Sequence, residues 1–516
     1  MQKNYLFEEK NTWPPQEDHE RQNRYYENHL LASGQHNKLA RLKGARAELT
    51  RIPINIPHLI VNKTADFLLG KGLTVSANRG DNSPEQKALE RIFTENGGNR
   101  LMYEIVQNAA LKGDSFVLCW HGRDSEAEAP RVHIQLLQSE YVFPEVNPYD
   151  KSKIDGFYYA VPVRGYDKNR KEIYTLAVSY YGTGFIERSQ YETTVLRSRQ
   201  VRFGHHAEPY EFRIGKQIGE TLRELTGINR NLITHIPNER TLGSNTWAGI
   251  DDITRVRELL DEIESRYMQA SKILDAHSEP NFVVPEGTLQ QSDEYGLPRF
   301  NITKQKVFEI PDGAQKPEYI TWNASLDSCF REIDALTKLL WQIAEMPELG
   351  MDGGLSGVSG TALEKRSSSI AAKVQRKKRY FEDGLKRIFT TVQELEHVLE
   401  YADYEIVEPS FRFGDSLPVS EQELTNTKIM QIQNKLESKK SAIMTLFGIT
   451  EEQALAKMEE IRNESQVELV AVKDLLDGKD TVTTTLQVTT SDLLNGLSDE
   501  LSELGIDLEG DDSEYA

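Results

Sequence analysis

Residues 356–389 read SGVSGTALEKRSSSIAAKVQRKKRYFEDGLKRIF, and they join a glycine-rich segment to a long basic helix. Residues 350–360, which overlap its start, hold five glycines and no proline. Glycine adopts positive φ angles at no steric cost, so such a run seldom keeps a single backbone conformation. We therefore expect a mobile loop here, followed by a rigid helix.

The predicted helix begins with a capping box. Thr361 and Glu364 have the spacing at which a hydroxyl and a carboxylate satisfy the first free backbone amides of a helix. No proline follows until Pro409, so the helix can continue to about residue 402, although Gly384 interrupts it. Apolar residues recur every three, four or seven positions, which keeps them on one face toward a core. They are Leu363, Ile370, Val374, Phe381, Leu385, Ile388, Val392, Leu395 and Leu399.

The same helix is basic, although the chain is acidic. Residues 361–387 carry nine basic and three acidic side chains, a balance of +6 (9 − 3), whereas the whole chain carries −20. Such a run is often only a solvated helix face, but it also fits a face that meets DNA phosphates or an acidic patch of a neighbouring subunit. The sequence does not decide among these readings. The candidate basic residues are Lys365, Arg366, Lys373, Arg376 and Lys377.

Length and composition set the class of protein. The 516 residues suffice for roughly three domains. No apolar run reaches the roughly 20 residues of a membrane span, and the N-terminus lacks a signal-peptide core, so we expect a soluble chain with no membrane partner. Cys119 and Cys329 are too few for a disulfide framework or a cysteine metal site; we expect both to be buried, in a reducing cytoplasm.

The net charge of −20 argues against a conventional nucleic-acid binder, which neutralises phosphates with a basic face. It does not argue against a surface that DNA must slide past. An acidic lining would repel phosphates and prevent sticking, so the charge is compatible with transient passage of DNA.

The rest of the chain divides into segments of different pattern. Residues 1–53 mix charge with little periodicity and predict a partly mobile, peripheral arm with short helices. Residues 54–245 combine a few helices with many short strands rich in Tyr, Val and Ile, the pattern of an α+β domain. A further short strand is expected within 404–413.

Two more helices are predicted on either side of a β-rich insertion. They cover 249–276 and 325–346, the second ends at Pro347, and the insertion covers 281–322. Such an arrangement predicts a projecting stalk with a tip. Residues 415–470 predict two or three short helices, and 471–516 form an acidic tail that has no basic residue after 490.

No motif for catalysis or metal binding is present in the pattern. The Gly-Lys pairs lack the remainder of a P-loop. His205 and His206 are adjacent, so on a strand they would point to opposite faces. Asp251 and Asp252 suit the start of a helix better than a catalytic pair. We therefore predict no catalytic residue, no metal site, no cofactor and no enzymatic activity.

Several motifs stand in a characteristic order. They are VNKTADFLLGKGLTV at 61–75, KGDSFVLCW at 112–120, LLQSEYVFPEVNPYD at 136–150, HIPNERTLGSNTWAGIDDITRVRELLDEIESRYMQAS at 235–271, the stretch 356–389 quoted above, FGDSLPVSEQELTNTKIMQIQ at 413–433 and FGITEEQALAKMEEIRNE at 447–464. Taken together, from about residue 50 to 465, they resemble the portal proteins of tailed bacteriophages of the siphophage type.

The resemblance implies a multidomain α+β subunit and a place for each segment. It implies an N-terminal arm (1–53), a wing (54–245, completed by 403–414), two stem helices (249–276 and 325–346), a small β-rich clip (281–322), a tunnel loop (348–360), a tunnel helix (361–402), a helical crown (415–470) and an acidic tail (471–516). The loop residues implied to line a DNA channel are Glu348, Leu349, Met351, Asp352, Leu355 and Val358.

The resemblance also implies a function and partners. Portal proteins form a ring, typically of twelve subunits, at one capsid vertex, through which double-stranded DNA enters during packaging and leaves at infection. The expected partners are further copies of the chain, the terminase large subunit, a head-completion adaptor, and the major capsid and scaffolding proteins. The expected location is the virion, after assembly in the host cytoplasm.

Two other readings stay open. A capsid-associated oligomer without a DNA channel would use the same helices for assembly only. A nuclease would use the basic helix to bind its substrate and carboxylates to hold Mg²⁺, but no carboxylate cluster stands out.

Overall fold

The computed structural model describes most of the chain. The described residues are 6–42, 52–70, 72–80, 82–123, 130–166, 169–170, 172–200, 207–240, 246–278, 281–283, 291–292, 298–299, 318–320, 326–347, 367–414, 421–447 and 454–462. Two compact units result, Met1–Pro418 and Val419–Ala516. Mixed helices and strands in the first unit make the fold α+β, as the sequence predicts.

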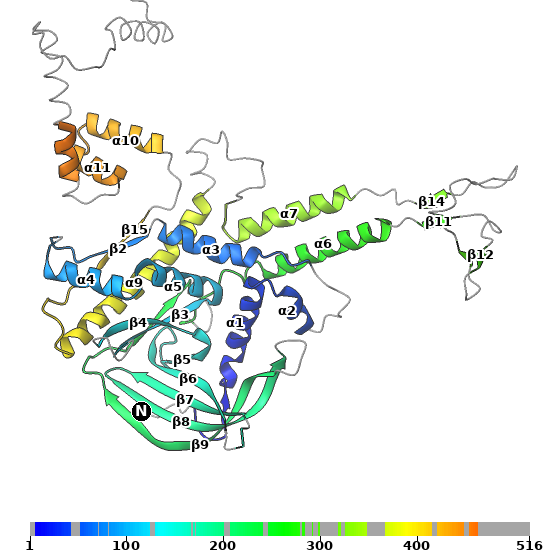
Figure 1. The fold of residues 1–516 in the computed structure, drawn as a ribbon, viewed down its shortest axis with the longest axis horizontal. Coiled ribbons are helices and arrows are strands. Elements are labelled where there is room, and N and C mark those ends of the chain that lie inside the picture. Colours follow the sequence, from blue (N-terminus) through cyan, green and yellow to red (C-terminus); the bar gives the residue numbers. More distant parts are fainter. Residues whose placement is uncertain are drawn as a thin grey trace, which may run out of the picture. The chain divides into compact units, whose positions relative to one another are not determined.

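A three-stranded antiparallel sheet lies at the centre of the first unit (Figure 1). Its order is β10 (Ile233–Pro237), β3 (Asp114–Gly122) and β4 (Arg131–Leu137). Helices α5 (Gly98–Lys112) and α9 (Ser368–Val398) both pack on it, and the first six residues of β3 are buried without alternation. The strand is therefore covered on both faces, as its apolar sequence requires.

Two further helices and one pair of short strands lie near this sheet. Helix α3 (Ile56–Leu69) packs on α5 and α9, and α4 (Pro84–Glu95) begins where Ser83 accepts a hydrogen bond from the backbone N–H of Gln86 at 3.1 Å. Strand β2 (Leu73–Ser76) pairs antiparallel with β15 (Ser410–Phe413). The predicted strand at 404–413 therefore returns to an element more than 300 residues earlier in the chain.

A second sheet has six antiparallel strands in the order β1-β9-β8-β7-β6-β5. The strands are β1 (Thr12–Trp13), β5 (Val142–Val146), β6 (Ile154–Tyr166), β7 (Glu172–Gly182), β8 (Phe185–Gln200) and β9 (Ala207–Leu225). Its core contains Phe7, Trp13, Phe143, Ala160, Leu176, Val178, Phe212 and Ile214. The 3-10 helix Gln16–Asp18 follows β1 in the chain, and the 3-10 helix Ser139–Tyr141 directly precedes β5.

The N-terminal segment is not peripheral, contrary to the sequence-based expectation. Helices α1 (His19–Ala32) and α2 (His36–Leu42) pack on the rest of the first unit, and Trp13 is buried in the second sheet. The Trp13 Nε1–H donates to the carbonyl oxygen of Ala160 at 3.0 Å, and Tyr25, which is fully buried, donates its hydroxyl to Asp114 at 2.9 Å. Residues 6–42 are therefore an integral part of this unit.

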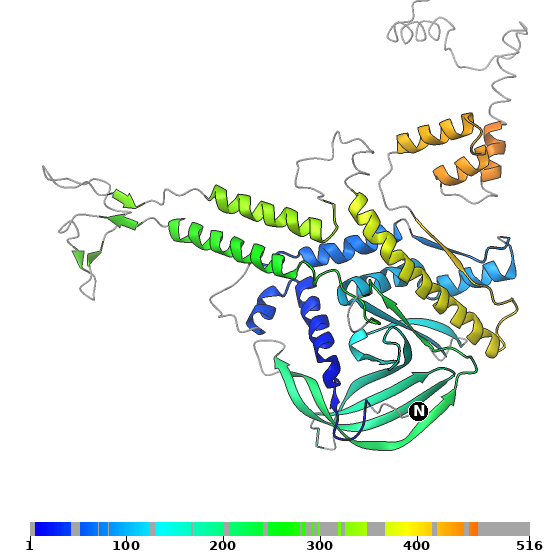
Figure 2. The same cartoon turned by 180° about the vertical axis from the view of Figure 1, so that it is seen from behind.

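Helices α6 (Arg257–Ser278) and α7 (Asp327–Ile343) lie side by side in both Figure 1 and Figure 2. Arg266 on α6 forms an ion pair with Glu332 on α7 at 3.3 Å. Between the two helices in sequence, β11 (Asn281–Val283) pairs with β14 (Glu318–Ile320), and β12 (Gln291–Ser292) pairs with β13 (Pro298–Arg299). We call α6 and α7 the hairpin.

Helix α6 begins later than the sequence suggested. Asp251 Oδ1 accepts hydrogen bonds from the backbone N–H groups of Ile253 and Thr254, at 3.0 and 2.7 Å, and holds the chain in a turn before Arg257. The predicted start of α9 at Thr361 lies outside the described residues. Cys119 is buried, as expected, whereas Cys329 is only half-buried.

The second unit contains α10 (Glu421–Gln433), α11 (Lys439–Phe447) and a helical stretch at 454–462. Lys428 on α10 forms an ion pair with Glu437 at 2.8 Å, at the turn between the first two helices.

Candidate functional site

The residues predicted to line a channel lie outside the described residues. These are Glu348, Leu349, Met351, Asp352, Leu355 and Val358, and the same holds for Lys365 and Arg366 of the predicted basic face. The structure does describe the two positions between which this segment runs. Helix α7 ends at Ile343 before the buried Met346, and α9 begins at Ser368 after the buried Ser367.

Two lysines of the predicted basic face point into the subunit. Lys373 and Lys377 are 4% and 3% exposed. The Nζ of Lys377 lies 2.5 and 2.6 Å from the two carboxylate oxygens of Asp252, and the Nζ of Lys373 lies 3.4 Å from the same carboxylate. The expectation of a basic face open to a partner therefore does not hold for these two lysines.

Asp252 is also bound by two neutral side chains. Thr64 on α3 donates its hydroxyl at 2.8 Å, and the amide of Asn238, just after β10, donates at 3.1 Å. Asn238 in turn accepts from Lys377 at 2.8 Å. The carboxylate thus joins α3, the end of β10, α9 and the loop before α6, all in a buried environment.

These contacts shift the pKa values of Asp252 and Lys377. Burial by itself would raise the pKa of Asp252, but the charges of Lys373 and Lys377, together with hydrogen bonds from Lys377 and Thr64, outweigh burial and hold that pKa below its usual range. Burial also lowers the pKa of Lys377, to about 8, against the opposing charge of Asp252. Removing one member of such a buried ion pair costs much more free energy than the intact pair adds to the net stability of the fold.

The same face of α9 holds the end of α7. Lys373 donates to the carbonyl oxygen of Ala344 at 2.9 Å, which satisfies a free carbonyl at the C-terminus of α7. Arg376 forms an ion pair with Glu345 and lies 3.6 Å from Glu239. Helix α9 therefore binds the chain just before α6 and the chain just after α7, so it fixes both ends of the hairpin at its base.

A second buried network joins the N-terminal segment to the central sheet. Asp114, at the start of β3, accepts from Tyr25 at 2.9 Å, from His235 at 2.7 Å and from the backbone N–H of Gly249 at 2.7 Å. Burial would raise the pKa of Asp114, but the hydrogen bond and charge of His235 outweigh it and lower the pKa. Like Asp252, this carboxylate contacts the chain that leads into the hairpin.

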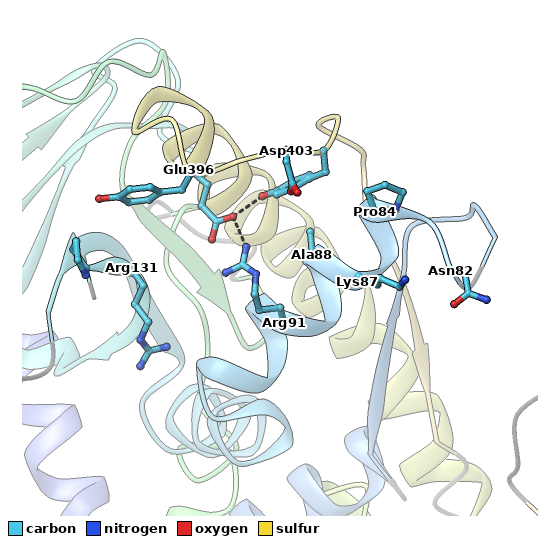
Figure 3. Close-up of a pocket in the computed structure, with 11 residues that line it drawn as sticks. Asn82, Pro84, Lys87, Ala88, Arg91, Arg131, Glu396 and Asp403 are labelled. Carbon is cyan, nitrogen blue, oxygen red and sulfur yellow. Dashed lines mark hydrogen bonds and ion pairs between the residues drawn. The ribbon is translucent and has the colours of Figure 1, made fainter. Parts of the chain in front are cut away.

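A pocket of about 470 Å³ is lined by residues of α4, the start of β4 and the end of α9; Figure 3 shows its lining. Glu396 accepts from Arg91 at 2.6 Å and from the hydroxyl of Tyr404 at 2.7 Å. Burial and the bond to Glu396 raise the pKa of Tyr404. These contacts link α4 to α9, and we interpret them as structural because Arg91 and Tyr404 both bind the buried Glu396.

The described residues also limit other kinds of site. Among them, no three His, Cys, Asp or Glu side chains gather so that they could hold a metal ion. No helix in the part of the chain that the structure describes has the length and hydropathy for a membrane span.

Helix α7 carries more apolar surface than α6 covers. Ile333, Thr337 and Leu340 are buried. Phe330, Leu339 and Ile343 remain 41%, 42% and 40% exposed. Leu339 and Ile343 are four residues apart, so they share one side of α7 and form an exposed apolar patch there.

Sequence reasoning missed the partners of Asp252, although it noted both the aspartate and the lysines. Asp252 and Lys377 are 125 positions apart, and no local pattern connects them. The spacing of Lys373 and Lys377 was the available signal, because residues four apart share a helix face, and the buried Ile370 and Val374 are neighbours of that face.

The fold thus defines an α+β protein whose two-helix hairpin is held at its base by the long helix α9. Residues 17–468 match the family described as phage portal protein, SPP1 Gp6-like, and the chain belongs to this family. No curated protein matches.

Solved structures of low identity were also found. The neck of a native GTA particle computed with C12 symmetry is 11% identical, with 76% of this chain and 89% of that chain covered and a TM-score of 0.43. The neck of an empty GTA particle computed with C6 symmetry is 11% identical, with 77% and 91% covered and a TM-score of 0.45. The virion of a native gene transfer agent is 11% identical, with 77% and 90% covered and a TM-score of 0.39.

Proposed function

We propose that this chain is the subunit of a closed ring at one capsid vertex, through which double-stranded DNA enters during packaging and leaves at infection. The observation that carries the proposal is the family match over residues 17–468, which includes the hairpin, the central sheet and α9. On this proposal the protein acts in the virion, after assembly in the host cytoplasm, and has no enzymatic activity or cofactor of its own.

The exposed apolar side of α7 supports ring assembly. A closed ring uses heterologous contacts, in which one side of a subunit meets a different side of the next. Leu339 and Ile343 would be covered by the neighbouring subunit, and the anchoring of the hairpin by Asp252 and Lys373 would hold every copy at the same angle. A ring of twelve is the number we propose.

The acidic character of the chain supports passage of DNA rather than binding. A net charge of −20 per subunit would repel phosphates. With Lys373 and Lys377 bound to Asp252, two of the nine cations of residues 361–387 are not available to DNA. We propose that the channel is narrowed by residues 348–360 and that Glu348, Leu349, Met351, Asp352, Leu355 and Val358 face the DNA.

The partners follow from the same proposal. The strand pairs β11–β14 and β12–β13 belong to the proposed clip, which would dock the terminase large subunit during packaging and a head-completion adaptor afterwards. The major capsid and scaffolding proteins would meet the proposed wing. Short strands give such a module backbone hydrogen-bonding groups and side chains for contact with a partner.

Electron microscopy of the purified protein tests the proposal directly. Class averages are expected to show top views of rings with an open centre and a constant number of subunits. Closed assemblies without a central opening would favour a capsid-associated oligomer that conducts no DNA. Monomers or irregular aggregates at all salt and protein concentrations would contradict both ring assembly and a channel.

A further inference from the structure

His36, the first residue of α2, lies between two hydrogen-bond acceptors. Its Nδ1 faces Oε1 of Glu264 on α6, and its Nε2 lies 2.8 Å from the carbonyl oxygen of Leu31 near the end of α1. A neutral imidazole has only one N–H group, so it could satisfy one of these acceptors but not both. The doubly protonated imidazolium satisfies both.

Glu264 is a buried carboxylate with few other partners. It is 1% exposed, and the same Oε1 also accepts the backbone N–H of Ile54 at 2.9 Å. A buried carboxylate is stable only when it is paired and hydrogen-bonded. His36, which is 3% exposed, supplies the positive charge. Loss of its proton would leave Glu264 buried without a counter-charge.

The charged groups around His36 act in the same direction. Burial by itself lowers the pKa of His36, but the hydrogen bond and charge of Glu264 outweigh burial and raise it, and Asp261 one turn earlier on α6 adds to this effect. Other charged groups on the packed elements have partners of their own: Glu27 of α1 pairs with Arg257 of α6, Arg24 of α1 with Asp251, and Arg266 of α6 with Glu332, while Lys38 of α2 lies over an aromatic ring of α1.

We propose that His36 and Glu264 form a pH-dependent latch that holds α2 on the hairpin helix α6 while the pair is protonated, and releases α2 as the pH rises. Helix α2 has seven residues, and besides His36 the apolar side chain of Leu39 is buried. Helix α1 is held separately through Tyr25 and Asp114, so the release is confined to α2 and the chain beside it. The latch does not depend on ring assembly.

The direction of the pH effect follows from linkage. A histidine whose pKa is higher in the folded state stabilises that state fully below its unfolded pKa of about 6.5, and the stabilisation is lost as the pH rises through the folded value. Opening of α2 is therefore expected to increase with pH from neutral to alkaline conditions.

Hydrogen–deuterium exchange of the full chain, followed by mass spectrometry from pH 6 to 9, tests the latch. After correction for the chemical exchange rate, opening in peptides that cover α2 is expected to rise by up to about tenfold per pH unit above the unfolded pKa of about 6.5, because one proton is released on opening, and to level off above the higher pKa of the folded state. Peptides from α5 serve as the internal reference and are expected to show no such rise.

Two variants make the test specific. His36→Gln is expected to abolish the pH dependence in α2, whereas His29→Gln, at an exposed position of α1, is expected to retain it. If His36→Gln does not fold, Glu264→Gln removes the carboxylate charge and is expected to shift the transition to lower pH. A wild-type α2 whose protection does not change with pH, or a His36→Gln profile equal to wild type, overturns the proposal.

Discussion

Asp252 is the residue at which α3, the end of β10, α9 and the loop before α6 meet. Asp252→Asn keeps the size of the side chain but leaves two buried lysines without their anion. Removing one member of a buried ion pair costs about 3–5 kcal/mol, so we expect the variant to unfold at a clearly lower urea concentration. All five tryptophans precede Pro418, so tryptophan fluorescence reports on the first unit.

The matched control for this variant is Glu408→Gln. Glu408 lies 3.7 Å from Lys386 and its side chain is 76% exposed, so solvent screens the pair. We expect its unfolding midpoint to equal that of the wild type. A midpoint for Asp252→Asn that also equals the wild type would contradict the role assigned to the buried carboxylate.

The low pKa values of Asp252 and Asp114 give a separate expectation for acid. Both values are lowered in the folded state, so their contribution to stability is present above the unfolded value of about 3.9 and is lost as the pH falls through and below it. The urea midpoint of the wild type should therefore fall steeply from pH 5 to pH 3. In Asp252→Asn the decline should be shallower, because one of the two groups no longer titrates; parallel curves would contradict this assignment.

At the scale of elements, the contact between α9 and β10 depends on Gly384. A Cβ at this position would lie 2.5 Å from Cγ1 of Ile236, which is 2% exposed. Gly384→Ala gains about 1 kcal/mol of helix propensity, but overpacking typically costs about 1–3 kcal/mol, and we expect a net loss of stability. Gly80→Ala, where a Cβ meets no atom within 4 Å, is the control. Urea unfolding measures both.

A double mutant distinguishes overpacking from a general intolerance of alanine in α9. Ile236→Ala removes the atoms that the new Cβ would approach. The combined variant should therefore lose less stability than the sum of the two single variants. Full additivity would show that Gly384 and Ile236 do not act on one another.

The sequence predicted the apolar face of α9 but not what lies opposite it. Ile370, Val374 and Leu385 are buried as their spacing indicates, because helical periodicity is a local property. The need for a glycine at position 384 and the ion-pair partner of Lys377 are set by Ile236 and Asp252, which lie far away in the chain. Periodicity within one helix carries no information about such distant residues. The N-terminal segment was mispredicted for the same cause, since Tyr25 is held by Asp114 across 89 positions.

At the scale of the whole molecule, the hairpin of one subunit is expected to be incomplete without a neighbour. Leu339→Glu places a charge on the exposed apolar side of α7, where the proposed ring interface would bury it. Burial of an unpaired charge is strongly unfavourable, so the variant should remain folded, with an unchanged circular dichroism spectrum, but lose rings at least about tenfold. Asp334→Lys changes the charge at an exposed position on a different side of α7 from Leu339 and should assemble like the wild type. Sedimentation velocity measures the ring fraction of each variant, and equal ring fractions for Leu339→Glu and wild type would place the subunit interface elsewhere than on α7.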